Sequence, residues 1–216
     1  MTEKSKSENK TLYLRHLHFI DFENYGEKNP IYINIIRNPV EHWISNYYFL
    51  RNGFEKDQKL TPEQKKKWET KWKTDPNKHL SIEECIEKGL SDCVNIYSDL
   101  IPFFCGNDAW CRKRDRKALE AAKKNISGKY LFVGVLEDIE NSLKLLELYL
   151  PNFFSGMSEI LDKISKKLKT GSVTLNKKDD SEEVKKYLGD RLVLELELYE
   201  FVRQLMLVRV KKDLKI

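Results

Sequence analysis

A pair of histidines and an arginine are the residues of this chain best suited to chemistry. His16 and His18 lie two residues apart, and Arg37 directly follows a run of strand-forming residues. Histidine readily takes up a proton near neutral pH, so either could act as a general base. An arginine at the carboxyl end of a strand is typical of an anion site. The other interpretations are histidines bonded to backbone, a His-x-His metal site without accompanying carboxylates or cysteines, and a solvated arginine.

The stretch from residue 31 to residue 49 would position this arginine. Its first six residues, IYINII, predict a buried strand. Asn38 is then a good helix N-cap, Pro39 suits the first helical position, and Glu41 stands three residues after the cap. An apolar stripe at helical spacing follows, formed by Val40, Trp43, Ile44 and Tyr47. Ser45 lies roughly 100° off that stripe, so we expect it to point away from the core.

These residues resemble a known nucleotide-binding segment. Arg37-Asn38-Pro39, followed by Ser45 and an aromatic run, is similar to the 3′-phosphate-binding segment of sulfotransferases that use 3′-phosphoadenosine 5′-phosphosulfate (PAPS). Among those it is most similar to the uronyl and heparan sulfate 2-O-sulfotransferases. Their usual form is Arg-Asp-Pro with a second arginine before the serine, whereas this chain has Asn38 and His42 there. The resemblance implies that Arg37 and Ser45 hold the 3′-phosphate, that PAPS is the donor, and that no metal takes part.

The same resemblance assigns roles to the histidines and to further basic residues. Alignment through Ile20-Asp21-Phe22 places the catalytic histidine of these enzymes on His16. Such a base would accept the proton of the attacking alcohol. The resemblance further implies substrate contacts from Arg51 and from Lys56, with Lys59 in the same loop. Arg15 could bind a carboxylate or sulfate of the substrate through paired donors, and His18, the neighbour of His16, is a further candidate for the substrate site. The alternative for these cations is ordinary solvated surface charge.

The chain has four cysteines, Cys85, Cys93, Cys105 and Cys111. An even number close together suggests two local disulfides in an oxidising compartment, and four cysteines allow three pairings. Zinc is the rival interpretation, although the spacings lack the short CxxC knuckle of structural zinc sites. The 2-O-sulfotransferases have cysteines in the same order, with a Pro-Phe-Phe-Cys-Gly segment that stands here at residues 102–106. That resemblance implies Cys85–Cys93 and Cys105–Cys111.

The pattern along the chain predicts a single α/β domain over residues 11–216, with a disordered tail over residues 1–10. The pattern predicts a parallel sheet flanked by helices, and the resemblance implies that this is a P-loop-like sulfotransferase fold. Strands are predicted at residues 11–22, 31–36 and 129–135. Helices are predicted from residue 39, from residue 81 and over residues 116–125, 136–150, 157–168 and 181–210. Residues 52–79 predict a polar surface excursion, and residues 169–178 resemble a loop that covers the nucleotide.

Composition sets the partners that are favoured. The 216 residues carry a net charge of +5, which favours polyanionic partners and does not by itself separate a sulfated polysaccharide from nucleic acid or a membrane. The modest size of the charge and the paired cysteines together disfavour nucleic acid. No apolar run approaches the roughly 20 residues of a membrane span, and no secretory signal is visible. The resemblance implies a membrane-anchored protein of the Golgi lumen and allows a homo-oligomer. Asn9-Lys10-Thr11 and Asn125-Ile126-Ser127 have the form of glycosylation acceptors.

One part of the expected enzyme has no counterpart. These sulfotransferases begin with a strand and a phosphate loop, and no Gly-rich loop precedes the segment that starts at Thr11. We therefore expect the first strand and the phosphate loop to be missing, with the chain matching the carboxyl-terminal two thirds of a catalytic domain. The resemblance predicts transfer of sulfate from PAPS to the 2-hydroxyl of a uronic acid in heparan or dermatan/chondroitin sulfate. The alternative is an inactive fragment or a non-catalytic protein that binds sulfated glycans.

Overall fold

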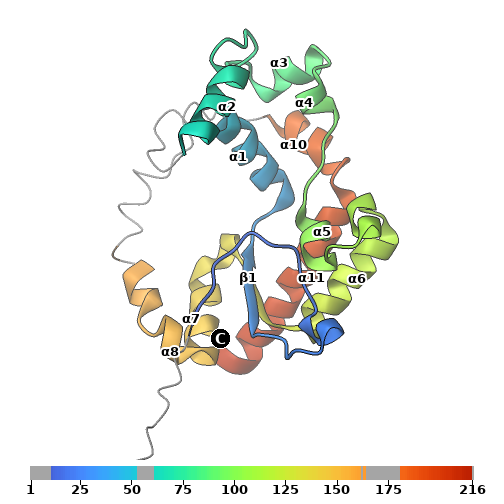
Figure 1. Ribbon diagram of the computed structural model, residues 1–216. Helices are drawn as coiled ribbons and strands as arrows, with labels where there is room; N and C mark the ends of the chain where they lie inside the picture. Colours follow the sequence, from blue (N-terminus) through green and yellow to red (C-terminus); the bar gives the residue numbers. More distant parts are fainter. Residues whose placement is uncertain (1–10, 53–60, 162, 164–180, 216) are drawn as a thin grey trace, which may run out of the picture.

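The computed structural model describes residues 11–52, 61–161, 163 and 181–215. Two short parallel strands stand at its centre, and helices surround them (Figure 1). The elements of the first half are η1 Phe22–Tyr25, β1 Tyr32–Ile36, α1 Pro39–Asn52, α2 Pro62–Trp72, α3 Ile82–Glu87, α4 Ser91–Val94 and α5 Leu100–Cys105. Those of the second half are η3 Ala109–Lys113, α6 Arg116–Gly128, β2 Tyr130–Val135, η4 Leu136–Asp138, α7 Ile139–Tyr149, α8 Pro151–Phe154, α10 Glu182–Gly189, α11 Val193–Arg209 and η5 Val210–Leu214.

The sheet brings two distant turns to one edge. β1 and β2 pair in parallel, with Ile35 opposite Gly134 and Ile36 opposite Val135. Both strands therefore end at the same edge, from which β1 leads toward α1 and β2 leads toward α7. Helices α6, α7 and α11 contact β2, and this cover buries every residue of β2 except Leu131. The predicted strands at residues 31–36 and 129–135, and their parallel arrangement between helices, are confirmed, although β1 is half-buried where the sequence predicts a buried strand, and Ile36 is its one buried residue.

Two clusters of buried side chains form the core. The larger one surrounds the sheet and includes residues of α5, α6, α7 and α11. The second joins α1, α3, α4 and α10 and contains Ile44, Cys85 and Cys93. In Figure 1 this second group of helices lies above the sheet. Helix α1 thus connects the two parts of the molecule, because it starts at the end of β1 and buries its apolar stripe in the second cluster.

The prediction of one helix over residues 181–210 is wrong, because the segment forms two helices. Helix α10 ends at Gly189, and α11 begins at Val193. Between them Leu192 leaves helical geometry, with φ −111° and ψ 27°, while its side chain is fully buried in the second cluster. Farther along, Leu198 and Val202 of α11 belong to the larger cluster. The break lets one apolar sequence serve two cores, which a continuous stripe could not do.

The predicted strand over residues 11–22 is also wrong. Residues 11–21 have no regular secondary structure, and residues 22–25 form η1. The alternating pattern does not reflect a buried face, since residues 11–17 are all exposed and Phe19 is the one buried residue of the segment. A strand needs a neighbouring strand for its backbone groups. Here the Phe19 amide donates to the Phe103 carbonyl of a helix, over 2.8 Å.

The remaining predicted elements agree with the structure where it describes them. Helices at residues 82–87, 116–128 and 139–149 are confirmed within a few residues, and the capping box of Ser81 and Glu84 is present. Part of the predicted surface excursion is helical, as α2. Residues 157–161 are helical, while the rest of that predicted helix, the loop over residues 169–178 and the tail over residues 1–10 lie outside the described residues. No helix in the described part of the chain is long and apolar enough to cross a membrane.

Close packing at the end of β2 requires a glycine. The Ser142 hydroxyl of α7 donates to the Val135 carbonyl over 3.0 Å and accepts from the Val135 amide over 3.1 Å. Ser142 is fully buried. A Cβ atom at Gly134 would stand 2.6 Å from the Ser142 Oγ and 2.9 Å from the Phe132 ring. The absence of a side chain at Gly134 therefore lets α7 pack closely against the end of β2.

We expect Gly134→Ala to lower the free energy of unfolding by about 1–3 kcal/mol, the usual cost of overpacking a core. Urea denaturation would measure the change. Gly128→Ala is the matched control, because a Cβ at Gly128 meets nothing within 4 Å and alanine favours the helix. Equal stability of the two variants would contradict the packing described for α7 and β2.

Candidate functional site

The turn after β1 is built as the sequence predicted. The Asn38 Oδ1 accepts hydrogen bonds from the amides of Val40 (3.0 Å) and Glu41 (3.3 Å), so Asn38 caps helix α1. Pro39 is the first residue of the helix, where its missing N–H costs nothing. This cap fixes the direction in which Arg37 leaves the strand.

A second carboxylate locks this turn to the rest of the fold. Glu137 follows β2, and its Oε1 accepts the backbone N–H of Asn38 over 2.8 Å. Its Oε2 accepts the hydroxyl of Tyr199 on α11 over 2.9 Å. Burial of the Tyr199 ring, and then the hydrogen bond to Glu137, raise the pKa of Tyr199 to about 12. Sequence reasoning missed Glu137, although its place directly after a strand parallel to β1 is the signal that could have found it.

The Arg37 side chain lies partly exposed at this edge. Its exposed fraction is 31%, and its Nη2 is 3.7 Å from the Glu41 Oε2, one helical turn onward. Ser45 is half-buried on the same helix, and His42 is exposed. An anion that reached the guanidinium would have to compete with Glu41. Arginine suits such an exchange because its planar group can bind phosphate oxygens in pairs.

The two predicted histidines differ in how the fold holds them. His16 is exposed, whereas His18 is half-buried with its ring edge-on to Phe103, at 6.4 Å between centroids. The next residue, Phe19, is buried against Tyr32 and Tyr130, at the start of the two strands. Arg37 stands beyond the other end of β1. Within the described residues no hydrogen bond or ion pair joins His16 to Arg37, and a shared site for the two remains a prediction.

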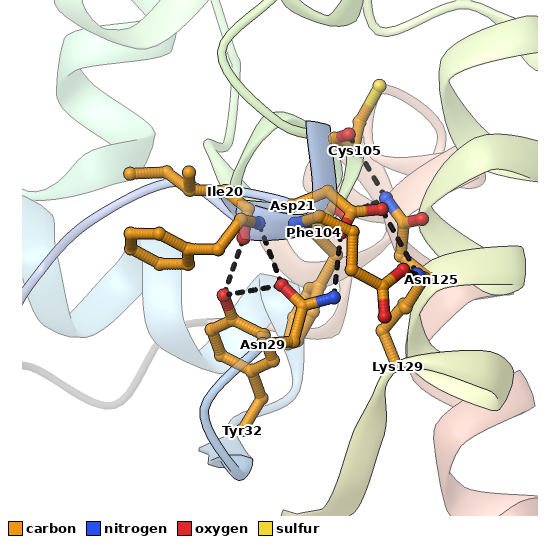
Figure 2. Close-up of polar contacts among 10 residues, drawn as sticks. Ile20, Asp21, Asn29, Tyr32, Phe104, Cys105, Asn125 and Lys129 are labelled. Atoms are coloured by element: carbon orange, nitrogen blue, oxygen red, sulfur yellow. Dashed lines mark hydrogen bonds and ion pairs between the residues drawn. The ribbon is translucent and has the colours of Figure 1, made fainter. Parts of the chain in front are cut away.

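A polar cluster fixes the chain just after the histidines (Figure 2). Asn29 donates to the Asp21 Oδ1 over 2.7 Å, and Lys129 lies 3.2 Å from the Asp21 Oδ2. Together with desolvation, which acts in the opposite sense, these contacts leave the pKa of Asp21 below its usual value, the hydrogen bond from Asn29 being the largest cause. The Tyr32 hydroxyl donates to the Ile20 carbonyl. The cluster ties residues 20–29 to both the sheet and the end of α6.

Arg51 does not occupy the exposed position expected of a substrate-binding residue. Its side chain is only 4% exposed. The guanidinium carbon lies 3.6 Å from the Tyr47 ring centroid and 4.5 Å from that of Trp72, and Nη2 is 3.2 Å from the Asp92 Oδ2. Burial lowers the pKa of Arg51, and its Nε has no hydrogen-bond partner. Arg51 therefore connects α1, α2 and α4 in the interior, and the expectation of a substrate contact is corrected to this structural position.

The other predicted substrate residues are placed less fully. Arg15 is exposed, and its Nη1 donates to the carbonyl of the preceding residue over 2.9 Å. Lys56 and Lys59 lie outside the described residues. The substrate contacts of Arg15, His18 and Lys56 thus remain predictions.

The predicted disulfides are present. Cys85 pairs with Cys93 and Cys105 pairs with Cys111, with Cα atoms 6.0 Å and 5.6 Å apart. This pairing replaces the zinc interpretation for these four residues. Among the described residues, no group of three or more His, Cys, Asp or Glu side chains could hold a metal ion.

The acceptor-like residue Asn125 has a structural role. It lies in α6, and its amide nitrogen donates to the carbonyls of Phe104 (2.9 Å) and Cys105 (3.1 Å), as Figure 2 shows. The amide is therefore engaged in the folded chain and is not presented to solvent as a glycan acceptor would be.

Comparison with known proteins supports the resemblance stated above. The uronyl 2-sulfotransferase of Mus musculus is 38% identical over 216 residues, which cover 98% of this chain and 51% of that protein. The human uronyl 2-sulfotransferase is 38% identical over 93% of this chain and 48% of its own length. Heparan sulfate 2-O-sulfotransferase 1 of Gallus gallus is 37% identical over 88% of this chain and 51% of its own length. The resemblance to these two groups is confirmed, and the chain spans about half the length of the curated relatives it matches. No family model matches the chain.

We expect Arg51→Ala to lower the free energy of unfolding by about 2–4 kcal/mol, because it empties a buried site and removes two cation–π contacts. Arg191→Ala is the matched control. Arg191 also stacks on the tyrosine four residues before it, Tyr187, at 3.4 Å, and also donates to that residue's carbonyl, but it is exposed. Its loss should cost about 1 kcal/mol or less. Denaturation curves that show equal losses would mean that enclosure by Trp72 and Asp92 adds nothing.

Proposed function

We propose that this chain forms part of a glycosaminoglycan uronyl 2-O-sulfotransferase, which transfers sulfate from PAPS to the 2-hydroxyl of a uronic acid in heparan or dermatan/chondroitin sulfate. The observation that carries the proposal is the arginine at the carboxyl edge of a parallel sheet, on a turn held by Asn38 and Glu137. Its supporting evidence is the similarity to uronyl 2-sulfotransferases over nearly the whole chain. We further propose the P-loop-like sulfotransferase fold for the domain over residues 11–216.

In this proposal Arg37 and Ser45 bind the 3′-phosphate of the nucleotide. Arg37 is partly exposed, and its present partner is a partly exposed carboxylate, a kind of pair that contributes only about 0.2–1 kcal/mol. A phosphate can bind the guanidinium through paired hydrogen bonds of about 2.7–2.9 Å, which are shorter than this 3.7 Å ion pair. The phosphate should therefore displace Glu41, while the bond from Asn38 to Glu137 keeps the turn in place.

His16 is the proposed general base. The 2-hydroxyl oxygen of the uronic acid forms a bond to sulfur, and the bond between sulfur and the bridging phosphate oxygen breaks. The hydroxyl proton passes to a ring nitrogen of His16, and adenosine 3′,5′-bisphosphate leaves. His16 is exposed, so a long acidic polysaccharide could reach it. Arg15 and His18 are neighbours on the same segment and are proposed to contact the acceptor.

The groups that bind the 5′ side of the donor are proposed to come from sequence outside this chain. The chain spans about half the length of its curated relatives. In the described structure β1 pairs with β2 on one lateral side and has no strand on its other side. The N–H of Ile35 donates instead to the side chain of the preceding residue, Asn34, over 2.8 Å. Two-stranded sheets are marginal on their own, so a further strand at this edge would suit the fold. A Golgi-lumenal setting, with the two disulfides, is part of the same proposal.

A second candidate function is binding of sulfated glycans without turnover. Its support is the net charge of +5, which favours binding of a sulfated polyanion. The two candidates differ in nucleotide binding, which only the sulfotransferase requires.

We expect adenosine 3′,5′-bisphosphate to bind this chain weakly and Arg37→Ala to remove about 2–4 kcal/mol of that affinity, as a phosphate loses its charged partner. Glu41→Gln should instead strengthen binding about two- to fivefold, because it removes the competing carboxylate. Calorimetry would measure both. Unchanged affinity of the Arg37 variant would remove this residue from the site, and equal binding of adenosine 5′-phosphate would refute the 3′-phosphate assignment.

Transfer of sulfate should be little or none for residues 1–216 alone and should return when a strand and phosphate loop from a related 2-O-sulfotransferase are joined in front. In that complemented protein we expect His16→Ala to lower kcat by about 10²–10⁴, the usual contribution of a general base. Nucleotide affinity should stay the same, because the base meets the acceptor. His18→Ala should have the smaller effect. Full turnover of His16→Ala with an inactive His18→Ala would move the base to His18, and two fully active variants would exclude both.

A further inference from the structure

The end of helix α5 is an anchor whose backbone carbonyls are all engaged. The last carbonyls of a helix have no partner within it. Here the Pro102 carbonyl accepts the Gly106 amide over 3.0 Å, and the carbonyls of Phe104 and Cys105 accept the Asn125 side chain (Figure 2). The Phe103 carbonyl, between them, accepts the backbone N–H of Phe19 over 2.8 Å. One helix end thus binds both α6 and the segment that carries the histidines.

The side chain of Phe19 fixes the same point from the other side. It is 7% exposed and lies edge-on to Tyr32, with 5.3 Å between ring centroids, and 5.9 Å from Tyr130. His18 packs its ring edge-on to Phe103. Residues 11–17 before it are exposed. Phe19 is therefore the first residue of the described chain that is buried, and the position of His16 is set from it.

A glycine controls how closely the anchor approaches Phe19. Gly106 follows α5 and has φ 126°, a conformation that other residues rarely adopt. A Cβ atom there would stand 3.3 Å from the Phe19 carbonyl oxygen. The Phe19 amide thus bonds to α5 itself, and the Phe19 carbonyl oxygen lies beside Gly106, in the loop that the Cys105–Cys111 disulfide closes. A side chain at residue 106 would therefore crowd the Phe19 carbonyl oxygen and, because of the positive φ, would also strain the turn at residue 106.

We propose that Phe103 and Gly106 are positioning residues for the histidine base, acting through the backbone of Phe19. The inference rests on the proposed function, since it needs His16 to be the base. We include the Cys105–Cys111 disulfide in this positioning role, because it closes the loop that starts at Cys105, whose carbonyl accepts the Asn125 side chain. The Cys85–Cys93 disulfide does not, because it lies in the other core cluster with α1 and α10.

Hydrogen exchange of the Phe19 amide in the full chain tests the anchor directly. We expect Gly106→Ala to speed this exchange by at least about tenfold, since the bond to Phe103 opens more often. Gly89→Ala is the matched control: Gly89 also has positive φ, 62°, and also lies in a disulfide loop, but a Cβ there meets nothing within 4 Å. Unchanged exchange in Gly106→Ala, or an equal rise in both variants, would overturn the proposal.

Kinetics of the complemented protein then test positioning. Gly106→Ala should lower kcat for 2-O-sulfation about 10–100-fold and leave the affinity for adenosine 3′,5′-bisphosphate unchanged, whereas Gly89→Ala should change neither. Faster exchange with wild-type kcat would overturn the positioning role and leave the proposed function intact. Full turnover of both histidine variants would refute the proposed base and the positioning role with it, while the exchange data would still show the anchor.

If Gly106→Ala does not fold, the paired variants Cys105→Ser/Cys111→Ser and Cys85→Ser/Cys93→Ser make the same comparison. The first pair should speed exchange at Phe19 and lower kcat at unchanged nucleotide affinity. The second pair should leave kcat unchanged and should change the exchange at Phe19 only as far as it lowers the stability of the whole fold. The same exchange at Phe19 in both pairs would overturn the proposal.

Discussion

The parallel pairing of β1 with β2 is the constraint on which the candidate site depends. It brings the turn at Asn38 and the turn at Glu137 to one edge, although they stand 99 residues apart in sequence. The Glu137 carboxylate then binds the Asn38 amide and the Tyr199 hydroxyl, which joins both turns to α11. Arg37 is held at this edge because its backbone lies between the last paired residue and the capped first turn of α1. Loss of the strand register would move each of these contacts at once.

The charges at this edge oppose one another, and that balance shapes the proposed chemistry. Arg37 attracts an anion, while Glu41 is 3.7 Å from its guanidinium and Glu137 is bound to the next residue's amide. The two carboxylates play different parts. Glu137 is fixed by two hydrogen bonds and holds the turn, whereas Glu41 forms a solvent-screened pair with Arg37 that a phosphate can replace. A site of this kind favours a strongly charged group such as a 3′-phosphate over weaker anions.

Local sequence signals predicted the parts of the structure that are determined by interactions between residues close together in the sequence. The strand and capped helix around Arg37, the strand at residues 129–135 and several helices follow from apolar period and cap residues. The disulfide pairing came from the resemblance, not from spacing. The failures have tertiary causes. Phe19 pairs with a helix end where alternation had predicted a strand, and Leu192 turns from one core to the other inside an apolar stripe. Trp72 folds over Arg51 and removes it from the surface.

The central claim is that the edge at Arg37 binds the 3′-phosphate of the nucleotide. Its most direct test is a crystal structure of this chain with adenosine 3′,5′-bisphosphate. The account predicts the 3′-phosphate oxygens within hydrogen-bond distance of the Arg37 guanidinium, about 2.7–3.2 Å. It also predicts Glu41 turned away and the bond from Asn38 to Glu137 intact. A nucleotide bound elsewhere, or one that places its 3′-phosphate away from Arg37 while Arg37 stays paired with Glu41, would contradict it.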